Sequence, residues 1–415
     1  MKVLVSAIAC NPSGSSESHF GWQAVLAISK LHDVWVVTSE RYRSAIEEAR
    51  EQGEVPRNVQ FLFHGLIRPW HQNRLIARFQ SWLEYRRWAK TLPPKLAGWH
   101  QEIGFDVAHH VTYATWRVAS PLRKLGIPFI WGPVGGGEVF PKSLLHVVSR
   151  PARIFERLRD CSNWVASFSP AIRQSAKQAA KVFVANKETA DQLLRVGTAE
   201  EKIEELSAAF FSSEHFRKFE APFKAWDGRL EIFAGGNLEG RKGVAIALKA
   251  LRRVADQGID FRYTLGGRGP EFEYLQRLAK DLDLADRVAF TEGFSGDSYA
   301  QRLASSHVYL LPSLRDSAGL TLMEAMLSRC VPVVADCGGP GTIVTEDCGC
   351  KLPTVSEEKM VEAIAEKIVL LATSPEIRQR LGDEARARIM NFYSADHYIR
   401  KIERAYAEAV VGASH

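Results

Sequence analysis

The chain has 415 residues, of which 46% are hydrophobic and 25% charged. This is the composition of an ordinary globular protein with enough material for two domains. No apolar run approaches the roughly 18 residues of a membrane-spanning helix, so the sequence predicts none. The formal net charge of +6 is uneven, because residues 1–206 carry 27 Lys and Arg against 19 Asp and Glu. The first half is therefore expected to meet an anionic partner.

The beginning of the chain and its cysteines favour the cytoplasm. The opening MKVLVSAIACNPSG reads as a first β-strand rather than as a signal peptide. The six cysteines show no C-x-x-C spacing and no nearby histidine cluster, which favours reduced thiols over a metal or disulfide role. We expect a cytoplasmic protein, either free or peripheral on the inner face of the membrane.

The first elements form a strand, a glycine loop, a helix and a second strand. The strands are predicted over Lys2–Ala7 and Asp33–Thr38, and the helix over 20–31. This unit could bring Gly14 against a phosphate or a sugar, although a full G-x-G-x-x-G is absent. A flexible surface loop is the alternative.

Residues 68–99 differ in composition from their surroundings. Seven basic residues face a single acid, Glu84, and four tryptophans lie among them. Basic residues beside aromatics suit the headgroup zone of an anionic bilayer. The alternative is a helix that packs its tryptophans into its own domain while the arginines are solvated. Nucleic acid is a poorer interpretation, because no nucleic-acid motif accompanies the patch.

Two further features of the first half are candidates for ligand contact. A strand over 105–111 ends in His109 and His110, and a strand-end histidine can donate a hydrogen bond to a sugar hydroxyl or a phosphate. A purely structural role and a metal-ligand role are the alternatives, the latter without a second cluster nearby. The strand over 129–131 leads to three consecutive glycines, of which Gly136 and Gly137 are the last two. The backbone at these glycines could approach a ligand closely.

A second domain is predicted to start at residue 230, after an irregular connection over 207–229. Arg241 and Lys242 lie at its first strand–helix junction, where two cations could grip a diphosphate. The strand over 288–290 is followed by Gly293 and Phe294, a strand-end position suited to backbone contacts with a base. The D-x-D of Asp281 and Asp283 falls at a helix end and is interpreted as a solvated helix terminus, not as a metal site.

The stretch over 311–344 has the strand, loop, helix, strand and loop order of parallel α/β proteins, which bind ligands at the carboxyl ends of their strands. Asp316 and Gly319 follow one strand, and a helix is predicted over Leu320–Leu327. Backbone N–H groups at the start of that helix would form an anion site. Glu324, one turn further, could reach a ribose or sugar hydroxyl. We interpret the stretch as a nucleotide-sugar site.

Five motifs occur in order between about residues 230 and 345: AGGNLEGRKG, LGGRGPE, RVAFTEGF, PSLRDSAGLTLMEAM and VPVVADCGGPGTIV. With them the chain resembles the glycosyltransferases of family four, which have the GT-B fold. The resemblance implies an α/β protein with two Rossmann-like domains whose parallel sheets face each other across a cleft. Residues 1–206 would bind the acceptor and 230–394 the nucleotide sugar. The helix in 395–415 would pack back on the first domain.

The resemblance also implies roles for single residues. The E-x7-E pair of the family corresponds to Asp316, which would contact the donor sugar, and Glu324, which would contact the ribose. Lys242, assisted by Arg241, would bind the diphosphate. Backbone groups of Ala318, Gly319 and Leu320 would cover the sugar and phosphates. His110, or alternatively His109, would approach the transferring sugar, and Gly14 would meet the diphosphate.

The sequence departs from the family pattern at two positions. The first acid is Asp316 rather than Glu, and Asn237 stands where an arginine is usual, five residues before Lys242. The implied activity is retaining sugar transfer without a metal or other cofactor. The expected partners are a nucleoside-diphosphate sugar and a lipid-linked or membrane-associated glycan of surface polysaccharide assembly. A sugar-nucleotide epimerase and a non-catalytic nucleotide-sugar-binding scaffold are the alternatives.

Overall fold

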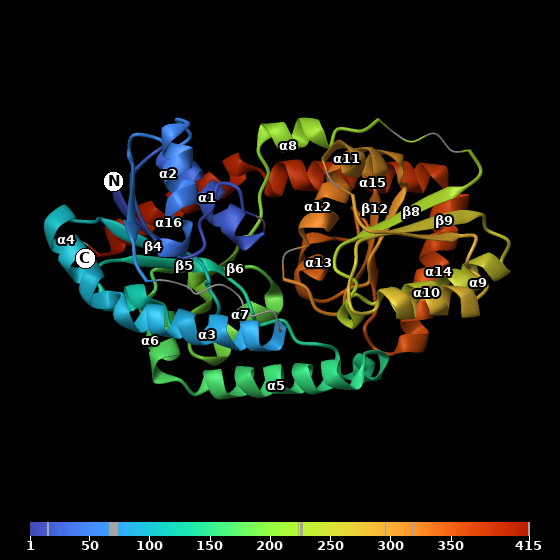
Figure 1. Cartoon of the computed structure of the whole chain (residues 1–415), viewed down its shortest axis with the longest axis horizontal. Helices are drawn as coiled ribbons and strands as arrows, with labels where there is room; N and C mark the ends of the chain where they lie inside the picture. The colour runs from blue at the N-terminus through green and yellow to red at the C-terminus, as the bar shows by residue number, and fades with distance from the viewer. Residues whose placement is uncertain are drawn as a thin grey trace. The chain divides into compact units, whose positions relative to one another are not determined.

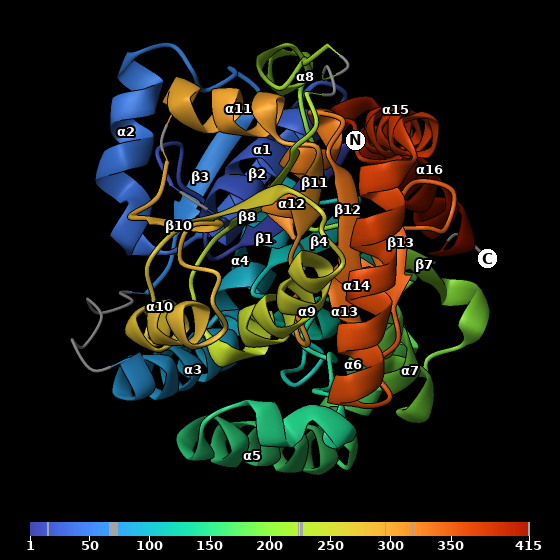
Figure 2. The same ribbon diagram turned by 90° about the vertical axis from the view of Figure 1, so that its right-hand side faces the viewer.

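The computed structural model describes residues 1–14, 16–65, 74–222, 224, 227–294, 296–317 and 319–413. The chain divides into two compact units. The first comprises Met1–Gly137, Cys161–Phe210 and Ala395–His415, and the second comprises Glu138–Asp160 and Phe211–Ser394. Residues 138–160, which fall within the range expected for the first domain, thus group with the second. Figure 1 and Figure 2 together label the elements named below.

The described residues of the first unit form a seven-stranded parallel sheet in the order β3-β2-β1-β4-β5-β6-β7. Every residue of the central strands β4 and β5 is buried, as expected of a parallel sheet with both faces covered by helices. The strands are β1 (Lys2–Ala7), β2 (Asp33–Thr38), β3 (Val59–Phe63), β4 (Val107–Thr112), β5 (Phe129–Val134), β6 (Lys181–Val184) and β7 (Ile203–Glu205).

Helices connect these strands in the right order for a doubly wound fold. They are α1 (Glu17–Ser29), α2 (Arg43–Glu51), α3 (Arg74–Thr91), α4 (Pro93–Ile103), α6 (Pro170–Gln178), α7 (Lys187–Arg195) and the C-terminal α16 (Ala395–Ala413). Helix α5 (Arg150–Ser167) begins in the second unit and ends in the first. The basic stretch over 150–178 forms two helices, α5 and α6. Ser169 lies between the two helices and is the N-cap residue of α6, where its side-chain hydroxyl accepts a hydrogen bond from the N–H of Ile172.

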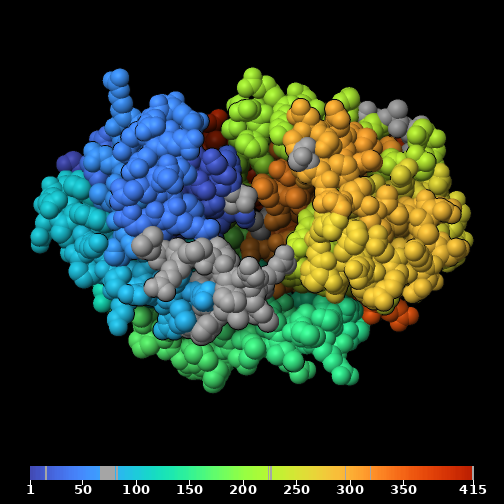
Figure 3. Space-filling model, viewed as in Figure 1, coloured from blue at the N-terminus to red at the C-terminus, as the bar shows by residue number. Residues whose placement is uncertain are grey.

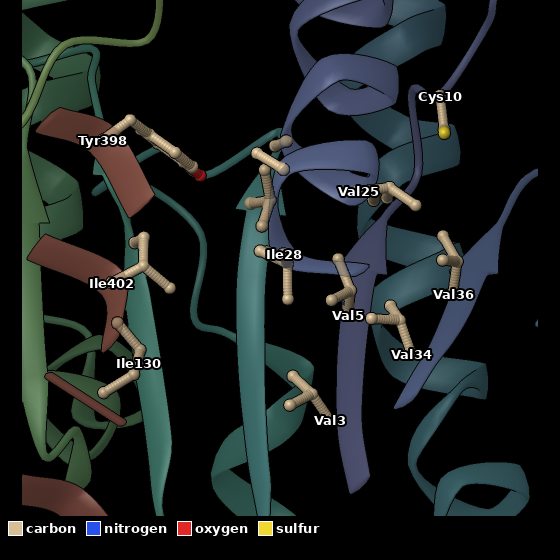
Figure 4. Close-up of a cluster of buried hydrophobic side chains, with 14 of the residues drawn as sticks. Val3, Val5, Cys10, Val25, Ile28, Val34, Val36, Ile130, Tyr398 and Ile402 are labelled. Atoms are coloured by element: carbon tan, nitrogen blue, oxygen red, sulfur yellow. The ribbon is translucent and has the colours of Figure 1, made fainter. Parts of the chain in front are cut away.

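The C-terminal helix α16 packs into the core of the first unit. Figure 4 shows Ile402 of α16 beside Ile130 of β5, with Tyr398 further along the same helix and in the same buried cluster. Tyr406 is also fully buried, and its hydroxyl lies 2.8 Å from Nδ1 of His109. Each large buried side chain contributes about 1.5–3 kcal/mol, so this helix is an integral part of the unit.

The described residues of the second unit form a six-stranded parallel sheet in the order β10-β9-β8-β11-β12-β13. Helices α9 and α14 pack side by side, as Figure 2 shows. The strands are β8 (Leu230–Gly235), β9 (Phe261–Gly266), β10 (Val288–Thr291), β11 (Val308–Leu310), β12 (Val331–Ala335) and β13 (Cys350–Leu352). The helices are α8 (Ser213–Lys218), α9 (Val244–Asp256), α10 (Phe272–Asp281), α11 (Gly296–Ser305), α12 (Leu320–Leu327), α13 (Gly338–Ile343), α14 (Glu357–Thr373) and α15 (Pro375–Phe392).

The strand order of the second sheet determines where a site can form. The chain leaves β8 toward β9 on one side and leaves β11 toward β12 on the other, although β8 and β11 are neighbours. The loops after these two strands therefore diverge and leave a crevice at their carboxyl ends, the usual ligand position in such folds. Within the described ranges, no helix has both the length and the apolar character needed to cross a membrane.

Candidate functional site

Lys242 and Asp316 meet at the carboxyl ends of the neighbouring strands β8 and β11. Lys242 ends a single 3-10 turn (Gly240–Lys242) after β8, and Asp316 lies in the loop between β11 and α12. Their side chains form an ion pair between Nζ and Oδ2. The two side chains are only 12% and 22% exposed, so water screens this pair less than it screens a surface pair.

Arg241 adds a second cation, which its neighbours fix in place. Its Nε donates to Oε2 of Glu239 at 2.6 Å, and its Nη1 donates to the carbonyl oxygen of Arg315 at 2.8 Å. The same Nη1 lies 3.9 Å from Oδ1 of Asp316. Asn237 donates from Nδ2 to Oε1 of Glu239 at 2.5 Å. Asn237 thus supports the carboxylate that orients Arg241, and the guanidinium of Arg241 lies beside Asp316.

Two glycines allow the backbones around Asp316 to approach closely. Gly243 has φ of 69°, and a Cβ built there would lie 2.3 Å from the carbonyl oxygen of Pro312. Gly338 has φ of 59°, and a Cβ there would lie 2.5 Å from the carbonyl oxygen of Asp316. The neighbouring Gly339 N–H donates to that same oxygen at 2.8 Å. Only glycine fits both positions, because any side chain would displace the loop that carries Asp316.

The start of α12 lies in the same loop. Gly319 is its N-cap residue with φ of 69° and no side-chain cap, and Leu320 begins the helix with 41% of its surface exposed. First-turn N–H groups of a helix have no intrahelical acceptor, so this end favours an anion. A small cavity is lined by Asp316, Gly319 and Thr321 among others. Ala318, predicted to cover the sugar, lies outside the described residues.

Glu324 lies one turn into α12, and its carboxylate is bonded to a tyrosine. Its Oε2 accepts a hydrogen bond from the hydroxyl of Tyr299 at 2.9 Å. Burial raises the pKa of the Glu324 carboxyl to about 7, although the Tyr299 hydrogen bond and the charge of Lys218 act to lower it. Sequence reasoning missed Tyr299, which lies in α11, and no local motif marks it.

Gly293 and Phe294 follow β10, as predicted. Gly293 is exposed with φ of 124°. The Phe294 ring packs edge-on against Phe233 of β8, with ring centroids 5.9 Å apart. The guanidinium of Arg302 lies 5.7 Å from the Phe294 centroid. The ring of Phe294 is therefore held against the sheet. The contact of Gly293 and Phe294 with a nucleotide base stays a prediction.

A buried ion pair supports the loop from the other side. Nη2 of Arg315 lies 2.8 Å from Oε1 of Glu156 in α5, and these side chains are 14% and 6% exposed. Nearby, Arg159 pairs with Glu138 at 2.6 Å. Sequence reasoning missed the Arg315–Glu156 pair, whose members are 159 positions apart.

His109 and His110 are fully buried in the first unit. Nε2 of His109 lies 2.8 Å from the carbonyl oxygen of Gly132, and Nε2 of His110 lies 3.1 Å from that of Thr112. Because a carbonyl oxygen only accepts, these two nitrogens donate the hydrogen bonds. Burial lowers the pKa of His109 to about 4 and that of His110 to about 3. This arrangement matches the structural alternative, and an approach to a transferring sugar stays a prediction.

The predicted glycines of the first unit lie in tight loops. The Gly14 N–H donates to the carbonyl oxygen of Asn11 at 3.2 Å. Gly136 has φ of 94°, and its carbonyl oxygen accepts from Arg117 at 2.8 Å. The Gly137 N–H donates to Oγ1 of Thr189 at 3.1 Å. These contacts explain the glycines by packing, and their predicted ligand contacts remain untested.

The described residues contain no group of three or more His, Cys, Asp or Glu side chains placed to hold a metal ion. Asp281 is the last residue of α10, and the side chain of Asp283 is 99% exposed. These two acids therefore lie at a solvated helix end, as predicted for the D-x-D sequence.

Part of the basic stretch over 68–99 packs inward. Trp88 is 4% exposed, and its Nε1 donates to the carbonyl oxygen of His64 at 2.9 Å. Arg86, Arg87 and Lys90 are exposed on the same helix, α3. Arg68 and Trp70 lie outside the described residues, as do the side chains of 74–79, 81 and 82. For Trp88, the packing alternative is therefore correct.

Comparison with known proteins gives a family for the second unit. Residues 216–388 match the family model described as glycosyl transferases group 1. The chain is 23% identical over 274 residues to an alpha-D-kanosaminyltransferase of Streptomyces kanamyceticus, a match that covers 63% of this chain and 66% of the relative. The matched part of the chain thus spans just under two thirds of that relative's length.

Solved structures share the fold over nearly the whole chain. The lipopolysaccharide outer core galactosyltransferase WaaB aligns with a TM-score of 0.64 and 15% identity, over 98% of this chain and 99% of its own. HepE of Anabaena in complex with UDP aligns with a TM-score of 0.61 and 15% identity, over 98% of this chain and 100% of its own. The two-sheet α/β architecture is therefore the GT-B fold.

Proposed function

We propose that the chain transfers a sugar from a nucleoside-diphosphate sugar to an acceptor, because its residues 216–388 match the family model described as glycosyl transferases group 1. One observation carries the proposal. Lys242, Arg241 and the start of α12 gather around Asp316 where the loops after β8 and β11 diverge. A diphosphate needs such an arrangement, with fixed cations and free N–H donors in a poorly hydrated crevice. The complex of HepE with UDP supports a nucleotide donor.

Each residue of the proposed donor site has a separate task. Lys242 and Arg241 bind the diphosphate, and the N–H groups from Gly319 and Leu320 complete its coordination. Asp316 contacts the donor sugar, and Glu324 accepts a hydrogen bond from the ribose. Gly293 and Phe294 flank the base. The side chain of Asp316 is one methylene shorter than that of a glutamate. The absence of a side chain at Gly338 lets the Asp316 backbone pack closely against α13.

The proposed chemistry is retaining and needs no metal. Cleavage of the bond between C1 and the phosphate oxygen leaves positive charge on the sugar and negative charge on the diphosphate. Lys242 and Arg241 stabilise that negative charge, which is larger in the transition state than in the bound donor. The departing phosphate oxygen takes the proton of the acceptor hydroxyl as the new C1–O bond forms on the same face.

The proposed acceptor is a lipid-linked or membrane-associated glycan of surface polysaccharide assembly, met on the cytoplasmic side of the membrane. The basic excess of residues 1–206 favours an acceptor that carries phosphate. WaaB, with the same fold, is named as a lipopolysaccharide galactosyltransferase, which supports this class of acceptor.

Product analysis tests the proposal. The purified chain is incubated with radiolabelled UDP- and GDP-sugars and with a lipid extract containing lipid-linked glycans, and the products are separated by chromatography. We expect label in the lipid fraction together with free nucleoside diphosphate. Release of an epimerised nucleotide sugar would identify an epimerase instead, and binding without any product would identify a scaffold.

A further inference from the structure

Trp164 and Val165 of helix α5 form an exposed apolar surface with Phe168, which directly follows the helix; it is called the α5 surface below. These side chains are 66%, 62% and 56% exposed. The rings of Trp164 and Phe168 contact each other edge to face, with centroids 5.0 Å apart. Figure 3 shows α5 along the lower edge of the face in view. Soluble monomeric proteins rarely expose large contiguous apolar patches. Such a patch marks a surface that binds a protein, a membrane or a ligand.

The same helix has further apolar side chains at helical spacing. Ile154 and Leu158 are 59% and 63% exposed. Positions 154, 158 and 165 fall on one face of a helix, because steps of three or four residues return to the same side. The apolar character is therefore a stripe along α5 rather than an isolated residue.

A groove lined by cations lies directly beside the α5 surface in the first unit. Its lining includes five basic residues, called the basic groove: Arg86 and Lys90 of α3, with Arg117, Arg123 and Lys124. Its volume is about 520 Å³, and its lining contains no Asp or Glu. Val165 belongs to both the α5 surface and the groove lining. The apolar and the cationic surfaces are thus continuous.

Two of the groove cations are held rigidly. Arg117 donates from Nη1 to the carbonyl oxygen of Gly136 at 2.8 Å and to Oδ1 of Asn163 at 2.9 Å. Arg123 donates from Nη1 to the carbonyl oxygen of Ser120 at 2.9 Å. Its Nε is buried and has no hydrogen-bond partner among the described residues. A half-buried guanidinium with an unused donor is suited to an anion with several acceptor oxygens, such as a phosphate.

The combination points to an amphiphile rather than to a free anion. A free phosphate needs cations but has no use for exposed Trp164 and Phe168. A nucleic acid would use the cations, but an apolar stripe along one helix is typical of segments that lie in the headgroup zone of a bilayer. Aromatic side chains prefer that zone, and nearby lysines and arginines attract its anionic lipids.

We propose that the α5 surface and the basic groove together dock the protein on an anionic membrane. The phosphoryl headgroup of a lipid occupies the groove, and Trp164, Val165 and Phe168 enter the acyl boundary. This inference rests on the membrane-associated acceptor proposed above, and it moves the membrane contact from the buried Trp88 to α5. It also retains the exposed cations of α3, Arg86 and Lys90, as part of the contact.

Vesicle sedimentation of the full chain tests the docking surface. The lipids are phosphatidylcholine with and without phosphatidylglycerol. We expect binding only to the anionic vesicles. The variant Trp164→Ser/Phe168→Ser removes the apolar contact and should weaken binding at least tenfold. The variant Lys90→Gln/Lys124→Gln should weaken it about fivefold for each lysine removed. Controls are Phe392→Ser, which is exposed in the second unit, and Lys280→Gln/Lys359→Gln.

The outcomes separate this inference from the proposed function. Equal binding to neutral vesicles, wild-type binding by both variants, or complete competition by free glycerol phosphate would overturn membrane docking. Binding of a DNA duplex that competes with the vesicles would point to nucleic acid and also overturn it. Thermal stabilisation by nucleotide sugars is measured on the same variants. We expect it to be unchanged, because none of these residues belongs to the donor site.

Discussion

Lys242 is the cation that the proposed reaction needs most. It lies next to Asp316 at the end of β8, where negative charge would develop on the departing diphosphate. Removal of one donor of this kind from an enzyme site typically costs about 10²–10³ in rate. We therefore expect Lys242→Ala to lower the transfer rate about 100-fold or more while the protein stays folded.

The matched control is Lys280→Ala, which removes an exposed lysine of the same unit. Rates are measured with saturating donor in the radiolabel assay, and circular dichroism checks folding. A Lys242→Ala enzyme that turns over within a few-fold of the Lys280→Ala enzyme would remove Lys242 from the catalytic site.

Glu324 should make stability depend on pH in an unusual direction. Its carboxyl has a pKa of about 7 in the folded chain and close to 4.5 in the unfolded chain. Between these values the folded state binds the extra proton, so the stabilisation is complete below about pH 4.5 and is lost as pH rises through 7. We expect wild type to lose on the order of 2 kcal/mol relative to Glu324→Gln between pH 5 and pH 8.

Urea unfolding of both proteins at the two pH values measures this difference. The glutamine keeps an acceptor for the Tyr299 hydroxyl but cannot titrate in this range. If the difference in free energy of unfolding between the two proteins is the same at both pH values, the Glu324 carboxyl does not titrate near pH 7. That result would contradict a buried Glu324 with a raised pKa.

At the level of elements, the sequence allowed α12 to be predicted with its observed bounds. Leu320–Leu327 is an apolar run with Gly319 in front of it, and such local signals need no tertiary information. Three glycines, Gly338, Gly339 and Gly341, lie within α13, Gly338–Ile343. Glycine is a poor helix former, but the close approach to the Asp316 carbonyl requires it there.

That close approach predicts the effect of a minimal substitution. Gly338→Ala places a Cβ 2.5 Å from the carbonyl oxygen of Asp316 at a φ of 59°. The matched control is Gly258→Ala, which has a φ of 76° but no atom within 4 Å of the added Cβ. Both changes cost about 1–2 kcal/mol in backbone strain, and the clash at Gly338 adds about 1–3 kcal/mol.

Thermal unfolding and donor affinity check the comparison. We expect Gly338→Ala to be the less stable variant and to bind nucleotide sugar more weakly, because the Asp316 loop must move. Equal stability of the two variants, with donor affinity retained, would show that this packing does not position the loop.

The contact between α5 and the Asp316 loop can be tested through its buried ion pair. Arg315→Ala leaves Glu156 with a 6% exposed carboxylate and no guanidinium partner at 2.8 Å. Breaking a buried pair in this way costs about 3 kcal/mol or more. Arg252→Ala, whose partner Asp256 is 56% exposed, should cost less than about 1 kcal/mol. Chemical denaturation measures the free energy of unfolding of both variants. A similar loss of stability in the two variants would contradict a structural role for the Arg315–Glu156 pair.

At the scale of the whole molecule, the parallel α/β architecture and the position of the site followed from the order of strands and loops. Lys242 and Asp316 were each placed at a strand end, and the neighbouring positions of β8 and β11 bring them together. Tyr299 could not be predicted, because its partner Glu324 lies on another helix and no motif joins them. The grouping of residues 138–160 with the second unit also depends on long-range contacts such as Arg315 with Glu156.

The first half shows the limit of compositional reasoning. Aromatic and basic residues over 68–99 suggested a membrane surface, yet burial of a tryptophan depends on which helix face meets the core. Trp88 packs against Tyr85 and His64 inside the first unit, whereas Trp164 of α5 is 66% exposed. Composition identified the cationic helix, and only the fold shows where the apolar surface lies.

The most direct measurement is thermal stabilisation by a panel of UDP- and GDP-sugars, compared for wild type, Lys242→Ala, Glu324→Gln and the control Lys280→Ala. A ligand that binds only the folded state raises the unfolding temperature in proportion to its affinity. We predict that at least one nucleotide sugar stabilises wild type and Lys280→Ala equally, and that both site variants lose most of this shift. Absence of any shift in wild type, or an equal shift in all four proteins, would contradict a nucleotide-sugar site built on Lys242, Asp316 and Glu324.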